Sequence, residues 1–433
     1  MTTVSGFQLG DETFDDLAGY CRTLGERARG ASLAMTRVAG RQRDAALRAM
    51  ADAIDAASEM IQSENAKDLE AGEKAGLSAA MLDRLRLDAK GVAKVSNSVR
   101  QIAAQPDPVG GVIEGRVLPN GIRLEKRRVP IGVVMMIFES RPNVTSDAAA
   151  LCVKSGNAVI LRGGKEARHS NAALAACVRD GLVKAGLPAD AVQFVGVTQR
   201  EAVGELLALE GLIDVAIPRG GESLIRAVVE QSRIPVIKHY TGNCHVYVDR
   251  ECDAAMAEAI VINAKTQRPG VCNAAETVLF HRDCVNNGLL KRIGEALLAR
   301  GVELRGCERT RAVLPAAKPA AEQDWHEEYL DMILAVRVVD DLSQAIDHIN
   351  RYGSKHTDAI VTARLDAAER FVNEVDAADV FVNCSTRFSD GGEYGLGAEI
   401  GISTDKLHAR GPMGAADLTT YKWVARGDGQ VRA

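Results

Sequence analysis

The hydrophobic pattern of the chain starts as a series of helices. Up to about Ala104, apolar residues recur three or four positions apart, with charged residues on the opposite faces. One such series consists of Leu47, Met50, Ile54, Ala57 and Ile61. This pattern predicts amphipathic helices that cover another layer of the protein and form no core by themselves.

A hairpin signal follows this helical region. The expected strands are residues 112–118 and 122–129, joined by an Asn120–Gly121 turn. Pro119 restricts the pair to a sheet edge or a protruding arm. Because a two-stranded ribbon alone in water is marginally stable, we expect the hairpin to dock on another subunit. Together with residues 418–424, it predicts a homo-oligomer, a dimer or larger.

From Ile131 onward, short apolar runs alternate with helical patterns. The runs have the length of strands that are buried on both faces. Strands are expected at residues 131–138, 158–161, 192–195, 213–217 and 236–238, and helices at 144–154, 171–185, 200–208 and 223–231. Such alternation predicts right-handed crossovers and a parallel, doubly wound sheet. Sheets of this kind bind ligands beyond the carboxyl ends of their strands.

The α/β pattern restarts after His239 and predicts a second α/β domain. Strands are expected at residues 246–248, 278–280, 333–338, 359–361 and 380–382, and helices at 254–265 and 287–300. Residues 272–277 are expected to begin a further helix. The glycine-rich segment 385–410 is too poor in apolar residues for a core element, so we expect a binding loop there.

Two glycine pairs lie at the ends of strands in the first predicted sheet. They contribute the candidate residues Arg162, Gly163, Gly164, Lys165, Arg219, Gly220, Gly221 and Ser223. Glycine lets a backbone approach a phosphate closely, and a helix N-terminus supplies N–H donors. Neither pair has the G-x-G-x-x-G spacing, so nucleotide binding and simple tight turns both remain open.

Cys272 is the candidate nucleophile. It follows Pro269 and Gly270 and precedes the expected helix, whose first turn would favour the thiolate form. The alternative is a small buried hydrophobic residue. The chain has nine cysteines without paired or metal-type spacing, which predicts a reducing, cytoplasmic setting and no metal.

Composition narrows the class of protein. The chain has 433 residues, 46% of them hydrophobic and 26% charged, as in a globular protein of two or three domains. A net charge of −5 offers no broad basic surface, so we expect no nucleic-acid partner. No apolar run approaches the ~20 residues of a membrane span, and we see no signal peptide at the start.

Several long motifs resemble a known family. They are Phe138-Glu-Ser-Arg-Pro-Asn-Val-Thr, Gln267-Arg-Pro-Gly-Val-Cys-Asn-Ala, Glu328-Tyr-Leu, Asn383-Cys-Ser-Thr-Arg-Phe-Ser-Asp-Gly and Gly395-Leu-Gly-Ala-Glu-Ile-Gly-Ile-Ser-Thr. With the thiol, the parallel sheet and the hairpin, they resemble the gamma-glutamyl phosphate reductase family of the aldehyde dehydrogenase superfamily. The similarity extends over nearly the whole chain.

This resemblance implies an α/β fold with two doubly wound domains and a protruding oligomerisation arm. Residues 1–108 and 127–238, with a returning segment near 385–404, would bind the dinucleotide. Residues 239–384 would form the catalytic domain, and 109–126 with 405–433 the arm. The implied reaction is NADPH-dependent reduction of L-glutamyl 5-phosphate to L-glutamate 5-semialdehyde and phosphate through a cysteine thioester, the second step of proline biosynthesis from glutamate.

Other functions and one partner also follow as hypotheses. The nearest alternative is another aldehyde or acyl-CoA dehydrogenase of the same superfamily, and a more distant one is a nucleotide-binding scaffold without catalysis. Glutamate 5-kinase, which makes the unstable substrate, is a candidate docking partner. No residue of the sequence indicates whether the two proteins dock.

The resemblance also assigns individual roles. Cys272 matches the nucleophile, Asn143 matches the asparagine that stabilises the oxyanion, and Glu328 matches the glutamate that holds the nicotinamide ribose. Arg162 and the two glycine pairs fall where the superfamily holds the adenosine and the pyrophosphate.

From residue chemistry alone, Arg141, Arg268 and Arg387 are candidates for the anionic groups of the substrate. A guanidinium binds carboxylate and phosphate in a bidentate way. Salt bridges on the surface or between domains are the alternative for each. Lys265 is expected to neutralise a neighbouring charge.

One departure from the wider superfamily concerns the reaction. Hydrolytic aldehyde dehydrogenases carry a glutamate that activates water, whereas the corresponding stretch here, residues 239–245, has no carboxylate. This difference favours acyl-phosphate reduction over oxidation of an aldehyde to an acid. We interpret His239, His245 and His408 as structural, hydrogen-bonded histidines.

Overall fold

The computed structural model describes residues 2–4, 7–9 and 15–432. The chain forms two compact units. Unit 1 consists of Met1–Lys238, Gly395–Gly401 and Met413–Ala433, and unit 2 consists of His239–Tyr394 and Ile402–Pro412. Each unit is built around a parallel sheet of its own.

From Leu17 to Ala104 unit 1 is helical, as the periodicity predicts, whereas residues 2–4 and 7–9, also expected to be helical, form short strands. The helices are α1 (Leu17–Met35), α2 (Gly40–Ala56), α3 (Ser58–Lys74), α4 (Ala79–Leu85) and α5 (Ala89–Ala104). Aspartates cap the N-termini of α1 and α5. Asp16 accepts a hydrogen bond from the Gly19 N–H, and Asp88 accepts one from the Gly91 N–H. The apolar face of α2 packs against α5 and against α7 (Arg168–Lys184), so these helices form the covering layer.

The sheet of unit 1 is parallel and buried. Its strands are β5 (Val133–Phe138), β6 (Ala158–Gly163), β7 (Val192–Phe194) and β8 (Val215–Arg219), in the order β7-β6-β5-β8. The connecting segments are α6 (Asn143–Lys154), η1 (Lys165–Ala167), α7, η2 (Ala189–Ala191), α8 (Glu201–Leu207) and α9 (Glu222–Gln231). The direction of winding reverses between β5 and β8, which marks the switch point where such sheets bind ligands.

One strand prediction in unit 1 is wrong. Residues 236–238 form a single bridge, between Val236 and Ala216, instead of a strand. The apolar run is short, and the chain leaves unit 1 after Lys238, so no further ladder hydrogen bonds can follow.

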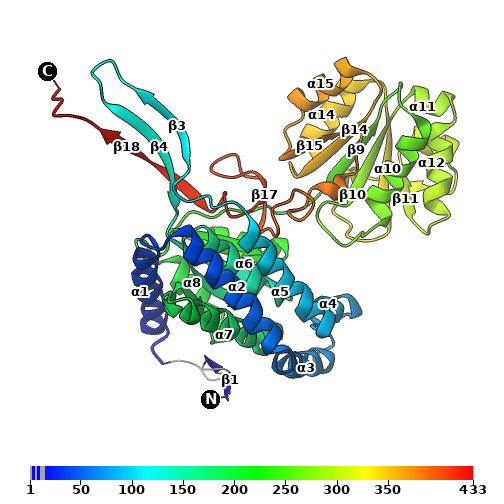
Figure 1. The fold of residues 1–433 in the computed structure, drawn as a ribbon. Coiled ribbons are helices and arrows are strands. Elements are labelled where there is room, and N and C mark those ends of the chain that lie inside the picture. The colour runs from blue at the N-terminus through cyan, green and yellow to red at the C-terminus, as the bar shows by residue number, and fades with distance from the viewer. Residues whose placement is uncertain (1, 5–6, 10–14, 433) are drawn as a thin grey trace. The chain divides into compact units, whose positions relative to one another are not determined.

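The predicted hairpin is present as β3 (Val112–Val117) and β4 (Arg123–Pro130), and Gly121 has the positive φ of 85° that its turn requires. The C-terminal strand β18 (Thr419–Arg426) pairs antiparallel with β4 and gives a sheet of order β18-β4-β3. This sheet projects from the helices of unit 1 (Figure 1). Two further pairs of short strands are β1 (Thr2–Val4) with β2 (Phe7–Leu9), and β16 (Gly401–Ser403) with β17 (Gly411–Met413).

Unit 2 contains a larger parallel sheet with helices on both faces. Its strands are β9 (Cys244–Val248), β10 (Ala275–His281), β11 (Glu303–Gly306), β12 (Lys318–Pro319), β13 (Ile333–Val339), β14 (Thr357–Val361) and β15 (Asp379–Val382), in the order β12-β11-β13-β10-β9-β14-β15. Its helical segments are α10 (Ala254–Thr266), α11 (Asp283–Asn286), α12 (Leu289–Leu298), α13 (Glu308–Val313), η3 (Glu322–Trp325), α14 (Leu342–Tyr352), α15 (Leu365–Glu374) and η4 (Thr386–Phe388).

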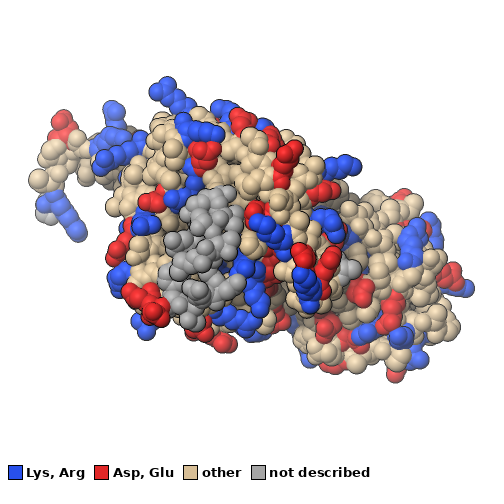
Figure 2. Space-filling view, turned by 90° about the horizontal axis from the view of Figure 1, so that it is seen from below, with Lys and Arg blue, Asp and Glu red and all other residues tan. Residues whose placement is uncertain are grey.

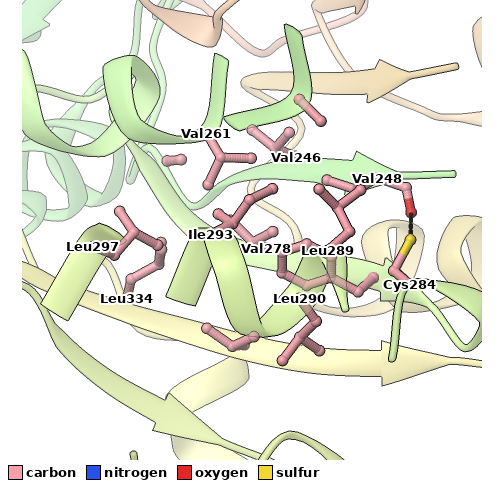
Figure 3. Packing of buried hydrophobic residues seen from close by; sticks show 14 of the residues in the cluster. Val246, Val248, Val261, Val278, Cys284, Leu289, Leu290, Ile293, Leu297 and Leu334 are labelled. Atoms are coloured by element: carbon pink, nitrogen blue, oxygen red, sulfur yellow. Dashed lines mark hydrogen bonds between the residues drawn. The ribbon is translucent and has the colours of Figure 1, made fainter. Parts of the chain in front are cut away.

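Alternate residues of the central strands of unit 2 face different helices. On one face, Val246 and Val278 pack with Ile293 and Leu297 of α12, as Figure 3 shows. The opposite face carries a second cluster that includes residues of α14 and α15. Burial of one such branched side chain contributes about 1.5–3 kcal/mol. The sheet is therefore a rigid support for the loops at its edges.

The surface has no single dominant charge on the face seen in Figure 2, where basic and acidic side chains are interspersed. This mixture agrees with the small net charge of −5. Among the described residues, no helix combines the length and the apolar character that a membrane crossing requires.

Candidate active site

Cys272 lies in a turn directly before β10, so the helix predicted from residue 272 onward is wrong. Residues Ala275–His281 are buried along their whole length and pair in parallel with β9 and β13. Burial in a central strand outweighs the local helix-start signal of Pro269, because strand formation depends on packing against neighbours. A helix dipole therefore gives no account of thiol reactivity here.

Strand order explains which segments meet around Cys272. In unit 2, β9 lies between β10 and β14, and all of these strands are parallel. The segments that precede them consequently meet at the amino edge of the sheet. These segments carry Gly242, Cys272 and His356.

Gly242 joins the Cys272 backbone to Glu328. Its N–H donates a 2.8 Å hydrogen bond to Oε1 of Glu328. A Cβ atom at Gly242 would lie 1.9 Å from the carbonyl oxygen of Cys272, so only glycine fits. The thiol of Cys244 donates to the same carbonyl at 3.1 Å. The expected nucleophile and the expected ribose-binding glutamate are thus held by one short segment.

Replacement of Gly242 by alanine is expected to lower activity by at least ~100-fold, because an error of about 1 Å in a reacting group has that effect. The new methyl group has to push the Cys272 backbone away and break the bond to Glu328. Steady-state kinetics would measure the effect. Gly30→Ala is the matched control, since a Cβ there meets nothing within 4 Å; equal activity losses in both variants would contradict the role of Gly242.

Two histidines flank the thiol. Ligand atoms of His239, Cys272 and His356 all lie within 4.8 Å of one another. The two rings meet edge to face at an angle of 74°, with centroids 5.4 Å apart. Nδ1 of His239 is 2.8 Å from the carbonyl oxygen of Ile402. His239 is thus hydrogen-bonded, as expected, and also lies beside the thiol, whereas His356 was missed because it lies far from Cys272 in sequence.

His245 does fit its structural interpretation. It is fully buried, and its Nδ1 is 3.1 Å from the buried carboxylate of Asp358. The partners are cross-strand neighbours in β9 and β14, where His245 is opposite Asp358.

A buried ion pair supports the Cys272 segment. Nζ of Lys265, at the end of α10, is 2.6 Å from Oε2 of Glu276 in β10, and both side chains are fully buried. Burial raises the pKa of Glu276 to about 7, against the opposing effect of Lys265. Burial also lowers the pKa of Lys265. Lys265 neutralises a neighbouring charge, as expected, and Glu276 also accepts a hydrogen bond from the N–H of Leu330.

Two of the candidate arginines lie in the same unit as Cys272. Arg387 donates from Nε to Oε1 of Gln267 at 2.9 Å. Its pKa is lowered first by burial and next by the positive charge of Arg268, so both cations act on the same region of unit 2. The Asn273 amide donates to the Ser389 carbonyl at 2.8 Å and connects the segments that carry Cys272 and Arg387. Two nearby cations suit a doubly charged anion.

The candidate cofactor residues of unit 1 lie at one edge of its sheet. Phe138 of β5 is level with Gly163 of β6 on one side and with Arg219 of β8 on the other. Both glycine pairs therefore lie at the carboxyl edge, and the pair after β8 is at the switch point. This arrangement fits a dinucleotide.

Carboxylates of the chain itself occupy both glycine turns. Glu139 accepts a hydrogen bond from the Gly221 N–H at 3.0 Å, and Glu166 accepts one from the Ser140 N–H at 2.7 Å. Ser140 has a positive φ of 42°, a strained conformation of the kind found at functional sites. A phosphate that binds the Gly221 N–H has to replace Glu139. Neither carboxylate is marked by a pattern in the sequence.

The remaining candidates of unit 1 differ in exposure. Arg162 is buried, donates to the carbonyls of Gly163 and Thr198, and has its pKa lowered by burial. A Cβ at Gly163 would lie 2.1 Å from Nδ2 of Asn171, so this glycine allows close packing of strand and helix. Arg219 is 3.4 Å from Glu399. Gly164 is half-buried, whereas Lys165, Gly220 and Ser223 are exposed.

Asn143 is the exposed first residue of α6. Its amide Nδ2 donates to Oδ2 of Asp147 at 2.9 Å, and Ser98 donates to the other oxygen. Burial raises the pKa of Asp147. Arg141 is half-buried and precedes α6 in the same motif. The orientation of the Asn143 amide is thus fixed by its own helix.

A pocket of about 280 Å³ lies at the carboxyl edge of the unit 2 sheet, opposite to Cys272. Its polar lining includes Asp249, His281, Arg364 and Arg370. None of the candidate residues from the sequence lines it. The thiol site in unit 2 is therefore at the amino edge, unlike the glycine turns in unit 1.

Comparisons with known proteins decide the family. The model of the aldehyde dehydrogenase family matches residues 21–305. A gamma-glutamyl phosphate reductase from Geotalea daltonii is 55% identical over 416 residues, which cover 96% of this chain and 99% of that protein. The chain belongs to the gamma-glutamyl phosphate reductase family.

Solved structures of this family and superfamily confirm the predicted fold. The crystal structure of gamma-glutamyl phosphate reductase from Thermotoga maritima is 41% identical, covers 95% of this chain and all of that chain, and has a TM-score of 0.93. An acetylating aldehyde dehydrogenase from Geobacillus thermoglucosidasius, at 17% identity and a TM-score of 0.69, covers 96% of this chain and 98% of its own and shares the fold. The aldehyde dehydrogenase family uses a nicotinamide cofactor, which agrees with the sheet of unit 1.

Proposed function

We propose that this chain reduces L-glutamyl 5-phosphate to L-glutamate 5-semialdehyde and phosphate with NADPH, the second step of proline biosynthesis from glutamate. The observation that carries the proposal is the 55% identity to a gamma-glutamyl phosphate reductase over nearly the full length of both proteins. The fixed position of Cys272 next to Glu328 through Gly242 supports it.

Cys272 is the proposed nucleophile. Its thiolate attacks the carbonyl carbon of the acyl phosphate, the C–O bond to phosphate breaks, and a thioester forms on the sulfur. The Asn143 amide and the backbone N–H of Cys272 are the proposed donors to the oxyanion, each contributing roughly 3 kcal/mol. The bond from Asn143 to Asp147 supports this role because it keeps the amide oriented.

The bound nicotinamide cofactor supplies the hydride that converts the thioester to the aldehyde level. The proposed pyrophosphate site consists of the glycine turns after β6 and β8, with Arg162 and Arg219 beside them. Glu328 is the proposed partner of the nicotinamide ribose. The hydrogen bond from the Gly242 N–H to its Oε1 keeps its carboxylate in place.

Arg268 and Arg387 are the proposed ligands of the substrate's phosphate or carboxylate, and Arg141 is a further candidate. The positive charge of Arg268, which adds to burial in lowering the pKa of Arg387, supports the first two, because nearby cations are most stable with an anion between them. The segment 239–245 brings the imidazole of His239 and no carboxylate to the thiol. This composition supports a thioester that is reduced and not hydrolysed.

Assembly and location are part of the proposal. The projecting sheet of β3, β4 and β18 exposes Val117, Tyr421 and Trp423, which suits an arm that docks on a second copy of the chain. We place the enzyme in the cytoplasm because its cysteines are free. Docking with glutamate 5-kinase stays a prediction of the family resemblance.

The reverse reaction tests the function. Supplied with L-glutamate 5-semialdehyde and NADP⁺, the enzyme is expected to form NADPH only when phosphate is present, and more slowly with NAD⁺. NADPH formation that does not depend on phosphate would contradict the proposal. A requirement for coenzyme A in place of phosphate would identify an acyl-CoA dehydrogenase, the alternative function.

A further inference from the structure

The thiol of Cys272 and the two imidazoles beside it have the chemistry of metal ligands. Among the described residues, His239, Cys272 and His356 are the group whose ligand atoms all lie within 4.8 Å of one another. Two imidazoles and one thiolate are ligands that Zn²⁺ prefers. No spacing in the sequence indicates this set, since its members precede different strands of unit 2.

The three ligand atoms need to move only slightly closer together to bind a zinc ion. Zn–N bonds are about 2.0–2.1 Å and Zn–S bonds about 2.3 Å, so ligand atoms around a tetrahedral ion lie roughly 3.5 Å apart. The observed limit of 4.8 Å is about 1 Å larger. Cys272 and His239 are half-buried, so their side chains have space to close on an ion, while His356 is fully buried and fixed.

The surroundings orient both rings. Nδ1 of His239 donates to the Ile402 carbonyl at 2.8 Å, which in a neutral ring leaves the lone pair on Nε2. Nδ1 of His356 is 2.8 Å from the hydroxyl of Thr357. Bonds of this kind from the second ring nitrogen are typical of histidines that bind metals.

The sulfur is equally well placed. The carbonyl of Cys272 is held by the Cys244 thiol at 3.1 Å, and Gly242 packs directly against the same peptide. Because the backbone of Cys272 is held in place, the thiol moves mainly by rotation about the Cα–Cβ bond. Two oriented rings and one anchored cysteine make a site that exists before the ion binds.

We propose that His239, Cys272 and His356 bind one Zn²⁺ ion, and that this ion reversibly blocks the thiol. Binding forms an S–Zn bond and releases the thiol proton to solvent, so no oxidant or reductant is needed. Three protein ligands leave the fourth position to water. The sulfur lone pair that would attack the acyl phosphate is then held by the metal. Only this blocking effect rests on the proposed function; the metal site does not.

Metal binding to the full chain is the first test. Equilibrium dialysis against Zn²⁺ with excess Mg²⁺ is expected to leave one zinc per chain, because Mg²⁺ prefers oxygen ligands. Cys272→Ser, His239→Asn and His356→Asn should each weaken zinc binding at least tenfold. Cys384→Ser is the matched control and should keep it, because this half-buried thiol is not one of the three ligands. Circular dichroism would establish that each variant is folded.

Alkylation of the thiol is the second test. Zn²⁺ should slow the reaction of Cys272 with iodoacetamide at least tenfold, as followed by peptide mass spectrometry, whereas Mg²⁺ should not. Cys384, which is also half-buried, serves as the internal control. Equal zinc binding by Cys272→Ser, or unchanged alkylation, would mean an adventitious ion only and overturn the proposal.

The two proposals can fail separately. Zinc binding by a chain without phosphate-dependent activity would leave the metal site intact and refute the enzymatic function. Full activity in a chain that binds no zinc would refute only the metal site.

Discussion

Cys272→Ala is expected to abolish phosphate-dependent NADPH formation from L-glutamate 5-semialdehyde, by a factor on the order of 10⁴ or more, as for other nucleophiles that form covalent intermediates. Without the sulfur no thioester forms, and the remaining donors can only bind the substrate. The thiol is half-buried in a turn whose backbone is fixed by Cys244 and Gly242. Initial rates with saturating phosphate would measure the loss.

Two controls make this result specific. Cys384→Ala removes another half-buried thiol of unit 2 and should leave activity within about twofold. Thermal unfolding of Cys272→Ala should be close to that of the original chain, because the side chain is small and partly exposed. Substantial activity in a folded Cys272→Ala protein would rule out the thioester route.

Lys265→Met is expected to lower the free energy of unfolding by about 3–5 kcal/mol, the cost of leaving one partner of a buried pair alone. Both side chains are fully buried, and Nζ of Lys265 is 2.6 Å from Glu276. Burial already raises the pKa of Glu276 to about 7. Loss of the Lys265 cation raises the pKa of Glu276 further, so protonation of the carboxylate offsets part of the destabilisation. Urea unfolding at pH 8 would measure the effect.

A second change should restore most of this stability. In Lys265→Met with Glu276→Leu, no buried charge remains, and replacement of whole buried pairs by apolar residues is often neutral. Lys291→Met is the surface control, because the side chains of Lys291 and Glu295 are each 60% exposed; it should change stability by at most about 1 kcal/mol. If Lys265→Met costs no more than Lys291→Met, the pair has no structural role.

The Lys265–Glu276 pair is also expected to support catalysis, because it fixes the segments that carry the reacting groups. It connects α10 with β10 on either side of the Cys272 turn, and Glu276 binds the N–H of Leu330, two residues after Glu328. We therefore predict that Lys265 and Glu276 help to position the thiol of Cys272 and the carboxylate of Glu328.

Local pattern predicts most of the fold because helices and buried strands have different hydrophobic periods. It fails where the pattern is weak: β11 consists of Glu303–Gly306 and has no apolar run, and β12 has two residues. It is misled at Cys272, where Pro269 and Gly270 look like the start of a helix. Burial between β9 and β13 makes the following residues a strand.

The sequence by itself determined the family, the alternation of strands and helices, and the identity of the candidate nucleophile, because these depend on local pattern and on contiguous motifs. The tertiary structure decided which residues surround Cys272. His239, Gly242 and His356 reach it because β9, β10 and β14 are parallel neighbours with their amino ends at one edge. Strand order is set by packing across the whole sheet, and no local stretch of sequence contains it.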